Sequence, residues 1–331
     1  MYPTANVDRD RFILDRRGPR KRHDPWRYQD LAVEDELTSS GDLAPTATIF
    51  LTGSECAWRC VMCDLWQYTT TESTPRGAIP AQIVEARRAL DMQGQAVSQV
   101  KLYNASNFFD PRAVPAEDYG AIAAGLMELD LVVVESHPAL IGHEVDRFLD
   151  ALYSLKGRQA PLLEVAMGLE TANPDALERL NKRVTIEQFS AAAAGLRNRG
   201  VALRVFALIC PPFIAATEQD RWLLESIACA LSCGAGVVSL IPTRAGNGAM
   251  EALTADGLYE PPSLTAIEQS FDLALAHAGR TRVFVDVWDL ERFSRCGHCF
   301  DARKKRLQAM NLTQHATARI ACVHCDHGVS A

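Results

Sequence analysis

The chain has 331 residues, 48% of them hydrophobic and 23% charged, a globular composition that suits one large α/β domain with appendages or two domains. A net charge of −7 excludes a global basic field that would draw the protein onto nucleic acid. The N-terminus has no apolar signal segment, and the one long uncharged stretch, residues 226–243, is broken by Pro242 and two glycines. We therefore expect a soluble cytoplasmic protein without a membrane span.

The first 45 residues are rich in Arg, Asp and Pro and show no sustained apolar period. We interpret residues 1–45 as a basic arm that wraps the core through Trp26 and Tyr28. Its eight Arg and Lys residues between Arg9 and Arg27, and a second basic run at 303–306, are either solvated surface or a phosphate-binding surface.

From Thr46 onward, short β-branched runs alternate with amphipathic stretches. Asn173 followed by Pro174 predicts a helix start, and Thr185 with Gln188 has capping-box spacing in a helix that can stop at Gly200. The expected strands are 46–51, 98–102, 131–135, 163–167, 202–209, 237–241 and 282–287. This alternation predicts right-handed βαβ units in a mainly parallel sheet, as in a partial or full (β/α) barrel. In such barrels the chemistry lies at the C-terminal ends of the strands.

Three cysteines follow the first expected strand with the spacing C-x3-C-x2-C: Cys56, Cys60 and Cys63. A 4Fe–4S cluster ordinarily takes four thiolates, so three leave one iron open. S-adenosylmethionine (SAM) can chelate that iron through its amino and carboxylate groups and be reduced there to a 5′-deoxyadenosyl radical. The alternatives are a chance grouping or a three-ligand zinc site, but a loop at the mouth of a barrel favours the cluster.

This loop resembles the radical SAM superfamily, although Met62 stands where many members carry an aromatic residue. Further segments narrow the resemblance to the elongator-like branch, nearest to the radical SAM subunits of archaeosine synthases, over residues 46–325. Those segments are Glu-Ser-His-Pro at 135–138, Gly-Leu-Glu-Thr-Ala-Asn-Pro-Asp at 168–175, Pro-Pro-Phe at 211–213 and Trp-Asp-Leu at 288–290, followed by Cys-x2-Cys.

The resemblance also implies where SAM binds. Members hold its amino group with a short motif after the second strand, and the matching positions here are Asn104, Ala105 and Ser106. An ordinary strand-to-loop turn is the alternative. Glu170, at the end of a later strand, is the expected partner of the SAM ribose hydroxyls, or else a helix cap. No catalytic residue acting on the substrate is identified.

Two C-x2-C pairs, Cys296 with Cys299 and Cys322 with Cys325, are separated by 22 residues, a layout typical of tetrahedral metal sites. Four thiolates suit structural zinc or a second, auxiliary Fe–S cluster. We expect His298 and His324 to be neighbours of this site and not ligands. The predicted domains are the arm (1–45), the barrel (46–290) and a small metal-binding extension (291–331).

These features predict an enzyme that cleaves SAM reductively with an external electron donor and abstracts hydrogen from a nucleoside-type substrate, free or in transfer RNA. Cleavage of a C–N or C–C bond or a rearrangement follows, so lyase and transferase types both stay open. One alternative is a sulfur-insertion enzyme that consumes a C-terminal Fe–S cluster. The other is a non-catalytic metal-binding or redox-sensing protein. The remaining thiols, Cys210, Cys229 and Cys233, are interpreted as buried residues without a ligand role. The oligomeric state is not predicted.

Overall fold

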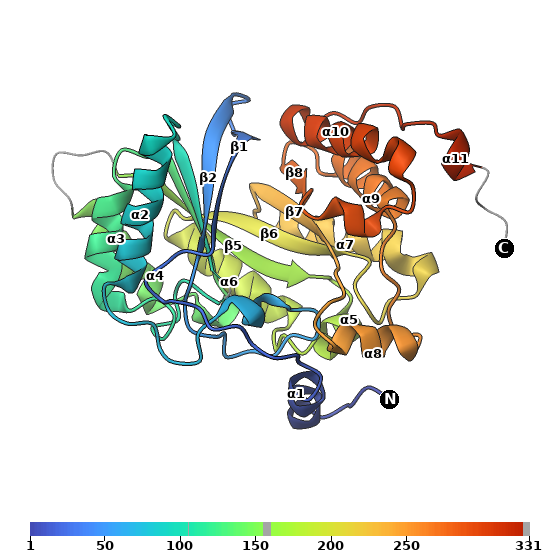
Figure 1. Cartoon of the computed structure of the whole chain (residues 1–331), viewed down its shortest axis with the longest axis horizontal. Coiled ribbons are helices and arrows are strands. Elements are labelled where there is room, and N and C mark those ends of the chain that lie inside the picture. Colours follow the sequence, from blue (N-terminus) through green and yellow to red (C-terminus); the bar gives the residue numbers. More distant parts are fainter. Residues whose placement is uncertain (105, 155–159, 327–331) are drawn as a thin grey trace.

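A computed structural model describes residues 1–104, 106–154 and 160–326 of the chain. At its centre is one eight-stranded sheet whose strands stand in chain order (Figure 1). β1 is antiparallel to β2, and β2 to β8 are all parallel. The strands are β1 (Asp30–Leu37), β2 (Leu43–Leu51), β3 (Gln99–Asn104), β4 (Leu131–Glu135), β5 (Leu162–Glu170), β6 (Ala202–Ile209), β7 (Val237–Pro242) and β8 (Arg282–Val285). No ladder joins β8 to β1 among the described residues, so the predicted α/β barrel is confirmed in its partial form.

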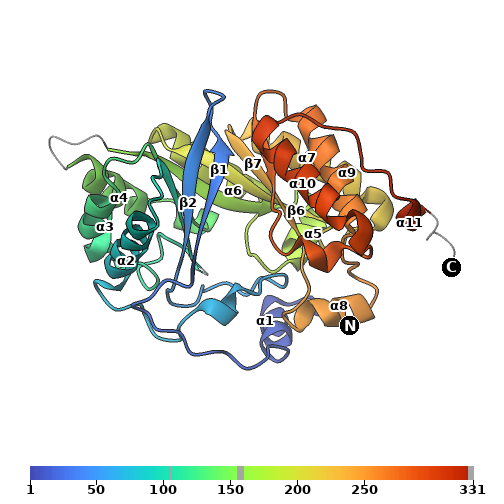
Figure 2. The same ribbon diagram turned by 45° about the horizontal axis from the view of Figure 1, so that its top comes forward.

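In both views α2, α3 and α4 lie at the left of the sheet, and α7, α9 and α10 lie at the right (Figures 1 and 2). The helices are α1 (Asn6–Leu14), α2 (Ala78–Met92), α3 (Tyr119–Leu126), α4 (His143–Tyr153), α5 (Pro174–Arg179), α6 (Ile186–Asn198), α7 (Gln219–Ser232), α8 (Ala249–Ala255), α9 (Leu264–His277), α10 (Gly297–Thr313) and α11 (Val323–Asp326). None of these helices, within the described residues, has both the length and the apolar character that crossing a membrane requires.

Two helix starts follow the signals in the sequence. The Asn173 side chain accepts the Ala176 amide at the start of α5, with proline at the first helical position. Thr185 and Gln188 form a reciprocal capping box at the start of α6. Beyond the end of α6, Gly200 adopts a φ of 69°.

The inner face of the sheet carries a buried network of charges near the start of the parallel strands. The Arg204 side chain is 2% exposed, and its Nε lies 2.7 Å from Oε1 of Glu164. The Glu36 carboxylate, from β1, pairs with both Arg204 and Lys101. Although burial opposes its ionisation, these two cations lower the pKa of Glu36 to about 2. The network therefore fixes β1 against β3, β5 and β6.

Residues 1–45 contain more regular structure than an arm, since they form α1 and the edge strand β1. Tyr28 packs against the main core, whereas Trp26 is exposed. α1 contributes to a second apolar cluster that also takes in α8. There a Cβ at Gly248 would overlap the Arg16 carbonyl oxygen, so the two segments approach closely only because residue 248 is glycine. The domain boundaries stay a prediction.

The open edge of the sheet is covered by α10. The Asn311 side chain accepts the Val285 amide at 2.8 Å and donates to the Val285 carbonyl at 2.9 Å. Gln314, directly after the helix, makes the same pair of bonds with Val283 at 2.6 and 2.8 Å. Two amide side chains thus take the place of a neighbouring strand and satisfy the edge of β8.

The basic run at 303–306 departs from both expectations for it. Arg303 and Arg306 are buried, and their guanidinium groups pair with Glu268 and Asp272 of α9. For Arg303 and Arg306 the prediction of a solvated or phosphate-binding surface was wrong, because α9 supplies carboxylates that the local sequence does not reveal.

Candidate functional site

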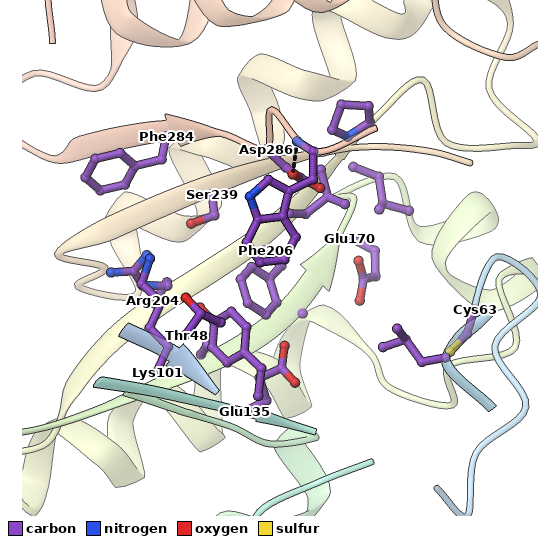
Figure 3. Close-up of a pocket in the computed structure, with 18 of the residues that line it drawn as sticks. Thr48, Cys63, Lys101, Glu135, Glu170, Arg204, Phe206, Ser239, Phe284 and Asp286 are labelled. Carbon is purple, nitrogen blue, oxygen red and sulfur yellow. Dashed lines mark hydrogen bonds between the residues drawn. The ribbon is translucent and has the colours of Figure 1, made fainter. Parts of the chain in front are cut away.

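A cavity of about 500 Å³ opens at the C-terminal ends of the parallel strands and reaches into the barrel. Cys56, Cys60 and Cys63 line it. Figure 3 shows Cys63 at one end and Arg204 with Lys101 at the other, and Glu135 and Glu170 lie between them. The cavity therefore has a sulfur-rich end and a charged end, in the part of the barrel where the sequence placed its chemistry.

The thiol of Cys56 is held by a relay of hydrogen bonds from two strand ends. Its Sγ accepts from Nδ2 of Asn107 at 3.2 Å. The Oδ1 of Asn107 accepts the backbone amide of His137 at 2.7 Å. Asn107 follows β3 and His137 follows β4, so adjacent strands together orient the cysteine.

The backbone of the cysteine loop is fixed from several sides. The Val61 amide donates to the Leu180 carbonyl at 2.9 Å, and Nδ2 of Asn247 donates to the carbonyl of Val61 at 2.7 Å and of Cys63 at 3.2 Å. Asn181 donates to the Arg59 carbonyl at 2.8 Å. The Val61 side chain is fully buried in the second apolar cluster. The loop is thus shaped by the rest of the fold, with its thiols turned to the cavity.

His137 forms one wall of this end of the cavity. Its ring stacks on Trp58, with centroids 3.7 Å apart. Nδ1 accepts the Ala139 amide at 3.1 Å, so Nε2 carries the proton and donates to the Lys182 carbonyl at 3.0 Å. Burial and the nearby Lys182 ammonium lower the pKa of His137 to about 3. The imidazole is therefore neutral near pH 7.

Glu170 and Lys182 form a buried ion pair with an Nζ–Oε1 distance of 2.7 Å. Burial alone would lower the pKa of Lys182, but the Glu170 carboxylate raises it above the ordinary value. Glu170 has a φ of 65° at an irregularity in the pairing of β5 with β6. The second carboxylate oxygen of Glu170, Oε2, has no side-chain hydrogen bond among the described residues.

Burial sets the protonation of the other groups at this end. It raises the pKa of the Cys60 thiol to about 12, and it also raises the pKa values of Cys56 and Cys63. Burial raises the pKa of Glu135 to about 8. Sulfur ligands buried in this way become thiolates on binding a cation, which replaces their protons.

Only some of the residues predicted to contact SAM line the cavity. Glu170 and Ser106 line the cavity, and the Ser106 Oγ is buried without a partner among the described residues. Asn104 is 3% exposed, and its amide atoms also lack a partner in the described part of the chain, but it is not among the lining residues. Ala105 lies outside the described residues. The SAM contacts themselves stay a prediction.

Three residues of this site were not identified from the sequence: Asn107, His137 and Lys182. His137 stands in the segment 135–138 that was singled out, and Asn107 directly follows the predicted SAM-contact positions 104–106. Both lie at strand ends where polar side chains gather. Lys182 has no local signal, because it reaches Glu170 across the whole of α5.

The four C-terminal cysteines lie together, as predicted. Their Sγ atoms are all within 4.8 Å of one another. The exposed rings of His298 and His324 stack beside them, with centroids 3.9 Å apart.

No protein-family profile matches the chain. It is 27% identical over 238 residues to archaeosine synthase subunit beta of Methanosarcina acetivorans, covering 69% of this chain and 66% of that one. The protein of the same name from Thermococcus kodakarensis is 28% identical, over 51% of each chain. The chain thus spans two thirds or less of these curated relatives. Among solved structures, archaeal Elp3 of Methanocaldococcus infernus superposes with a TM-score of 0.54 at 11% identity, over 85% of this chain and 65% of that one. That likeness shows the fold.

Proposed function

We propose that the chain is a radical SAM enzyme of the elongator-like branch, which cleaves SAM reductively and abstracts hydrogen from a nucleoside-type substrate. Its similarity to two archaeosine synthase beta subunits supports this proposal. The observation that carries this proposal is the position of Cys56, Cys60 and Cys63, which line one end of a cavity at the C-terminal ends of the strands.

The residues at this end fit an iron–sulfur cluster and its ligand. The three cysteines would hold a 4Fe–4S cluster, and the wall around them is polar. A bound cluster would supply the electron that breaks the sulfonium bond of SAM, giving a 5′-deoxyadenosyl radical. The Lys182 ammonium, kept charged by Glu170, offsets the negative charge of the neighbouring cysteine ligands. The second oxygen of Glu170, which has no side-chain hydrogen bond among the described residues, would accept a hydrogen bond from a ribose hydroxyl of SAM.

The middle of the cavity supports a flat substrate with polar edges. Tyr103 and Phe206 meet edge to face with ring centroids 6.0 Å apart, and the ring centroids of Phe50 and Trp288 are 4.9 Å apart. All four line the cavity, whose volume is in the range of small-ligand sites. Aromatic walls of this kind stack on nucleobases. The name of the two relatives, archaeosine synthase subunit beta, supports a modified base carried in transfer RNA.

The test is anaerobic reconstitution of the full chain with iron and sulfide, followed by SAM and dithionite. We expect brown visible absorption and the release of 5′-deoxyadenosine, and we expect the Cys60→Ala variant to lose both. Cys229→Ala is the matched control, since that thiol lies on α7 outside the cavity. Release of 5′-deoxyadenosine by Cys60→Ala, or none from an intact cluster supplied with transfer RNA and free nucleosides, would contradict the proposal.

A further inference from the structure

The second cysteine group has a geometry that distinguishes between its two expected occupants. The Sγ atoms of Cys296 and Cys322 are 3.9 Å apart, and those of Cys299 and Cys325 are 3.5 Å apart. No pair among the four exceeds 4.8 Å. A tetrahedral zinc ion with Zn–S bonds of about 2.3 Å holds its sulfur atoms about 3.8 Å apart.

An iron–sulfur cluster needs more room than this. Its thiolates are shared among two or more iron atoms bridged by sulfide, so cysteine sulfurs on different irons lie on opposite sides of a core of several atoms. Four sulfur atoms as close as those seen here surround a single ion. We propose that Cys296, Cys299, Cys322 and Cys325 bind one zinc ion, and that this ion fastens α10 across the open side of the barrel.

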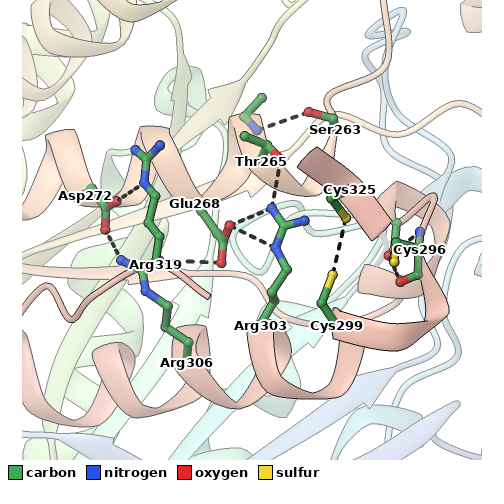
Figure 4. A network of polar contacts seen from close by, with 12 residues as sticks. Ser263, Thr265, Glu268, Asp272, Cys296, Cys299, Arg303, Arg306, Arg319 and Cys325 are labelled. Carbon is green, nitrogen blue, oxygen red and sulfur yellow. Dashed lines mark hydrogen bonds and ion pairs between the residues drawn. The ribbon is translucent and has the colours of Figure 1, made fainter. Parts of the chain in front are cut away.

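The ligands come from two separate helix starts. Cys296 and Cys299 stand at the first turn of α10, Cys325 lies in α11 and Cys322 directly precedes it. Figure 4 shows Cys296, Cys299 and Cys325 close together. The four thiolates complete a tetrahedral set, and the exposed His298 and His324 are not needed. With no open position the site is structural and not catalytic.

The chain between the two cysteine pairs is led back along α9 and α10 by charged groups. Arg306 donates to the carbonyls of Thr317 and Ala318 at 3.1 Å and to the Asp272 carboxylate at 2.6 Å. Arg319 donates to the other oxygen of Asp272 at 3.1 Å (Figure 4). These contacts hold the segment that leads to Cys322 and Cys325 against α9 and α10. The fold therefore positions both cysteine pairs of the site.

The opposite end of α10 is the part that covers the barrel edge. Asn311 and Gln314 bind the backbone of β8, and Asn311 also lines the cavity. α11 lies at the outer edge of the molecule in both views, beyond α9 and α10 (Figures 1 and 2). An ion there anchors the first turn of the helix whose last turn closes the sheet. This role does not depend on SAM chemistry.

The test counts metals in the full chain after anaerobic reconstitution. We expect one zinc per chain in the wild type and in Cys60→Ala, which loses iron. Cys325→Ala should lose the zinc and keep the iron and sulfide, and the control Cys229→Ala should keep all three. Iron and sulfide lost from Cys325→Ala in place of zinc would overturn the proposal, and because Cys60→Ala reports separately on the other cluster, the two proposals fail independently.

A second measurement leaves the four C-terminal cysteines unchanged. Cobalt exchanged into the Cys60→Ala protein should give the intense visible bands of a tetrahedral tetrathiolate site, and their absence would count against a single-ion site. Stripping zinc with a chelator should speed hydrogen exchange at the Val283 and Val285 amides, which bond to Gln314 and Asn311. The amides of β4, four strands away from β8 in the sheet, should not change. Unchanged exchange in β8 would show that the ion does not fasten α10.

Discussion

The buried ion pair between Glu170 and Lys182 exists because residue 168 is glycine. A Cβ at that position would overlap Oε1 of Glu170 and lie 2.6 Å from Nζ of Lys182. The strand therefore gives up a side chain to make room for two charges. The pair keeps its ammonium beside the cysteines, so a single missing methyl group determines the electrostatics of this end of the cavity.

Gly168→Ala should displace this ion pair. We expect a loss of about 1–3 kcal/mol in the free energy of unfolding, the usual cost of overpacking a filled site, together with weaker SAM binding. Thermal unfolding and calorimetric titration with SAM measure the two effects. Gly120→Ala, on an exposed face of α3 with no atom within 4 Å of its added Cβ, is the control and should be neutral or slightly stabilising. Equal effects in both variants would contradict the assignment.

Glu135 makes stability depend on pH. Burial raises its pKa from 4.5 to about 8, so between these values the folded chain binds more protons than the unfolded chain. Relative to the ionised form, protonated Glu135 gives its full stabilisation of the folded chain below pH 4.5, and this stabilisation is lost as the pH rises through 8. Comparing wild type with Glu135→Gln by urea unfolding at pH 5, 6.5 and 8 should show a relative loss of about 1 kcal/mol per pH unit.

The exposed Glu117 provides the control for this pH series. Glu117→Gln should follow the wild type at all three pH values. A constant difference between wild type and Glu135→Gln across the series would mean that Glu135 is ionised throughout in the folded protein.

At the scale of elements, α10 compensates for a sheet that does not close. A barrel has no free edge, whereas β8 presents amides and carbonyls on one side. The side-chain amides of Asn311 and Gln314 supply both a donor and an acceptor to each of two residues of β8. A helix can therefore take the place of a ninth strand at the edge of the sheet when its side chains carry the polar groups of a peptide.

Asn311→Ala should leave both polar backbone groups of Val285 without their partners. We expect a loss of about 1–3 kcal/mol in the free energy of unfolding and faster exchange of the Val285 amide. Gln308→Ala, on the exposed face of the same helix, should change stability by less than about 0.5 kcal/mol. If the two variants behave alike, helix propensity and not edge pairing explains the residue.

At the scale of the whole molecule, the N-terminal segment closes over the cysteine loop. Arg17 lies 2.7 Å from a Glu55 carboxylate oxygen, and Arg20 pairs with the other oxygen. Glu55 directly precedes Cys56, and the Arg59 guanidinium also contacts the Glu55 carboxylate. Three guanidinium groups thus gather on one carboxylate beside the cysteine loop.

Replacing Arg17 and Arg20 together by alanine should loosen this loop. We expect faster tryptic cleavage after Arg59 in the folded protein, measured by mass spectrometry of the first fragments. The double variant Lys21→Ala/Arg22→Ala removes the same charge from exposed positions and should be cleaved at the wild-type rate. Equal cleavage in both variants would show that the arm does not restrain the loop.

The sequence alone determined what depends on neighbours along the chain. The spacing of Cys56, Cys60 and Cys63, the capping box at Thr185 and the alternation of strands and helices are all local patterns, and each appears in the structure. β1 was missed because three acids, Glu34 to Glu36, interrupt its apolar character. The reason for Glu36 lies in two cations far along the chain.

Tertiary structure decided which distant residues meet. Lys182 reaches Glu170, Asn107 reaches Cys56, and Asn311 reaches Val285, and no spacing rule connects these pairs. A hydrogen bond or ion pair forms when the fold brings two groups within about 3 Å, and side-chain type alone does not specify its partner. The cysteine spacing by itself therefore predicts a metal site, which stays a prediction, whereas the charge and shape of the cavity around these cysteines appear only once the strands stand side by side.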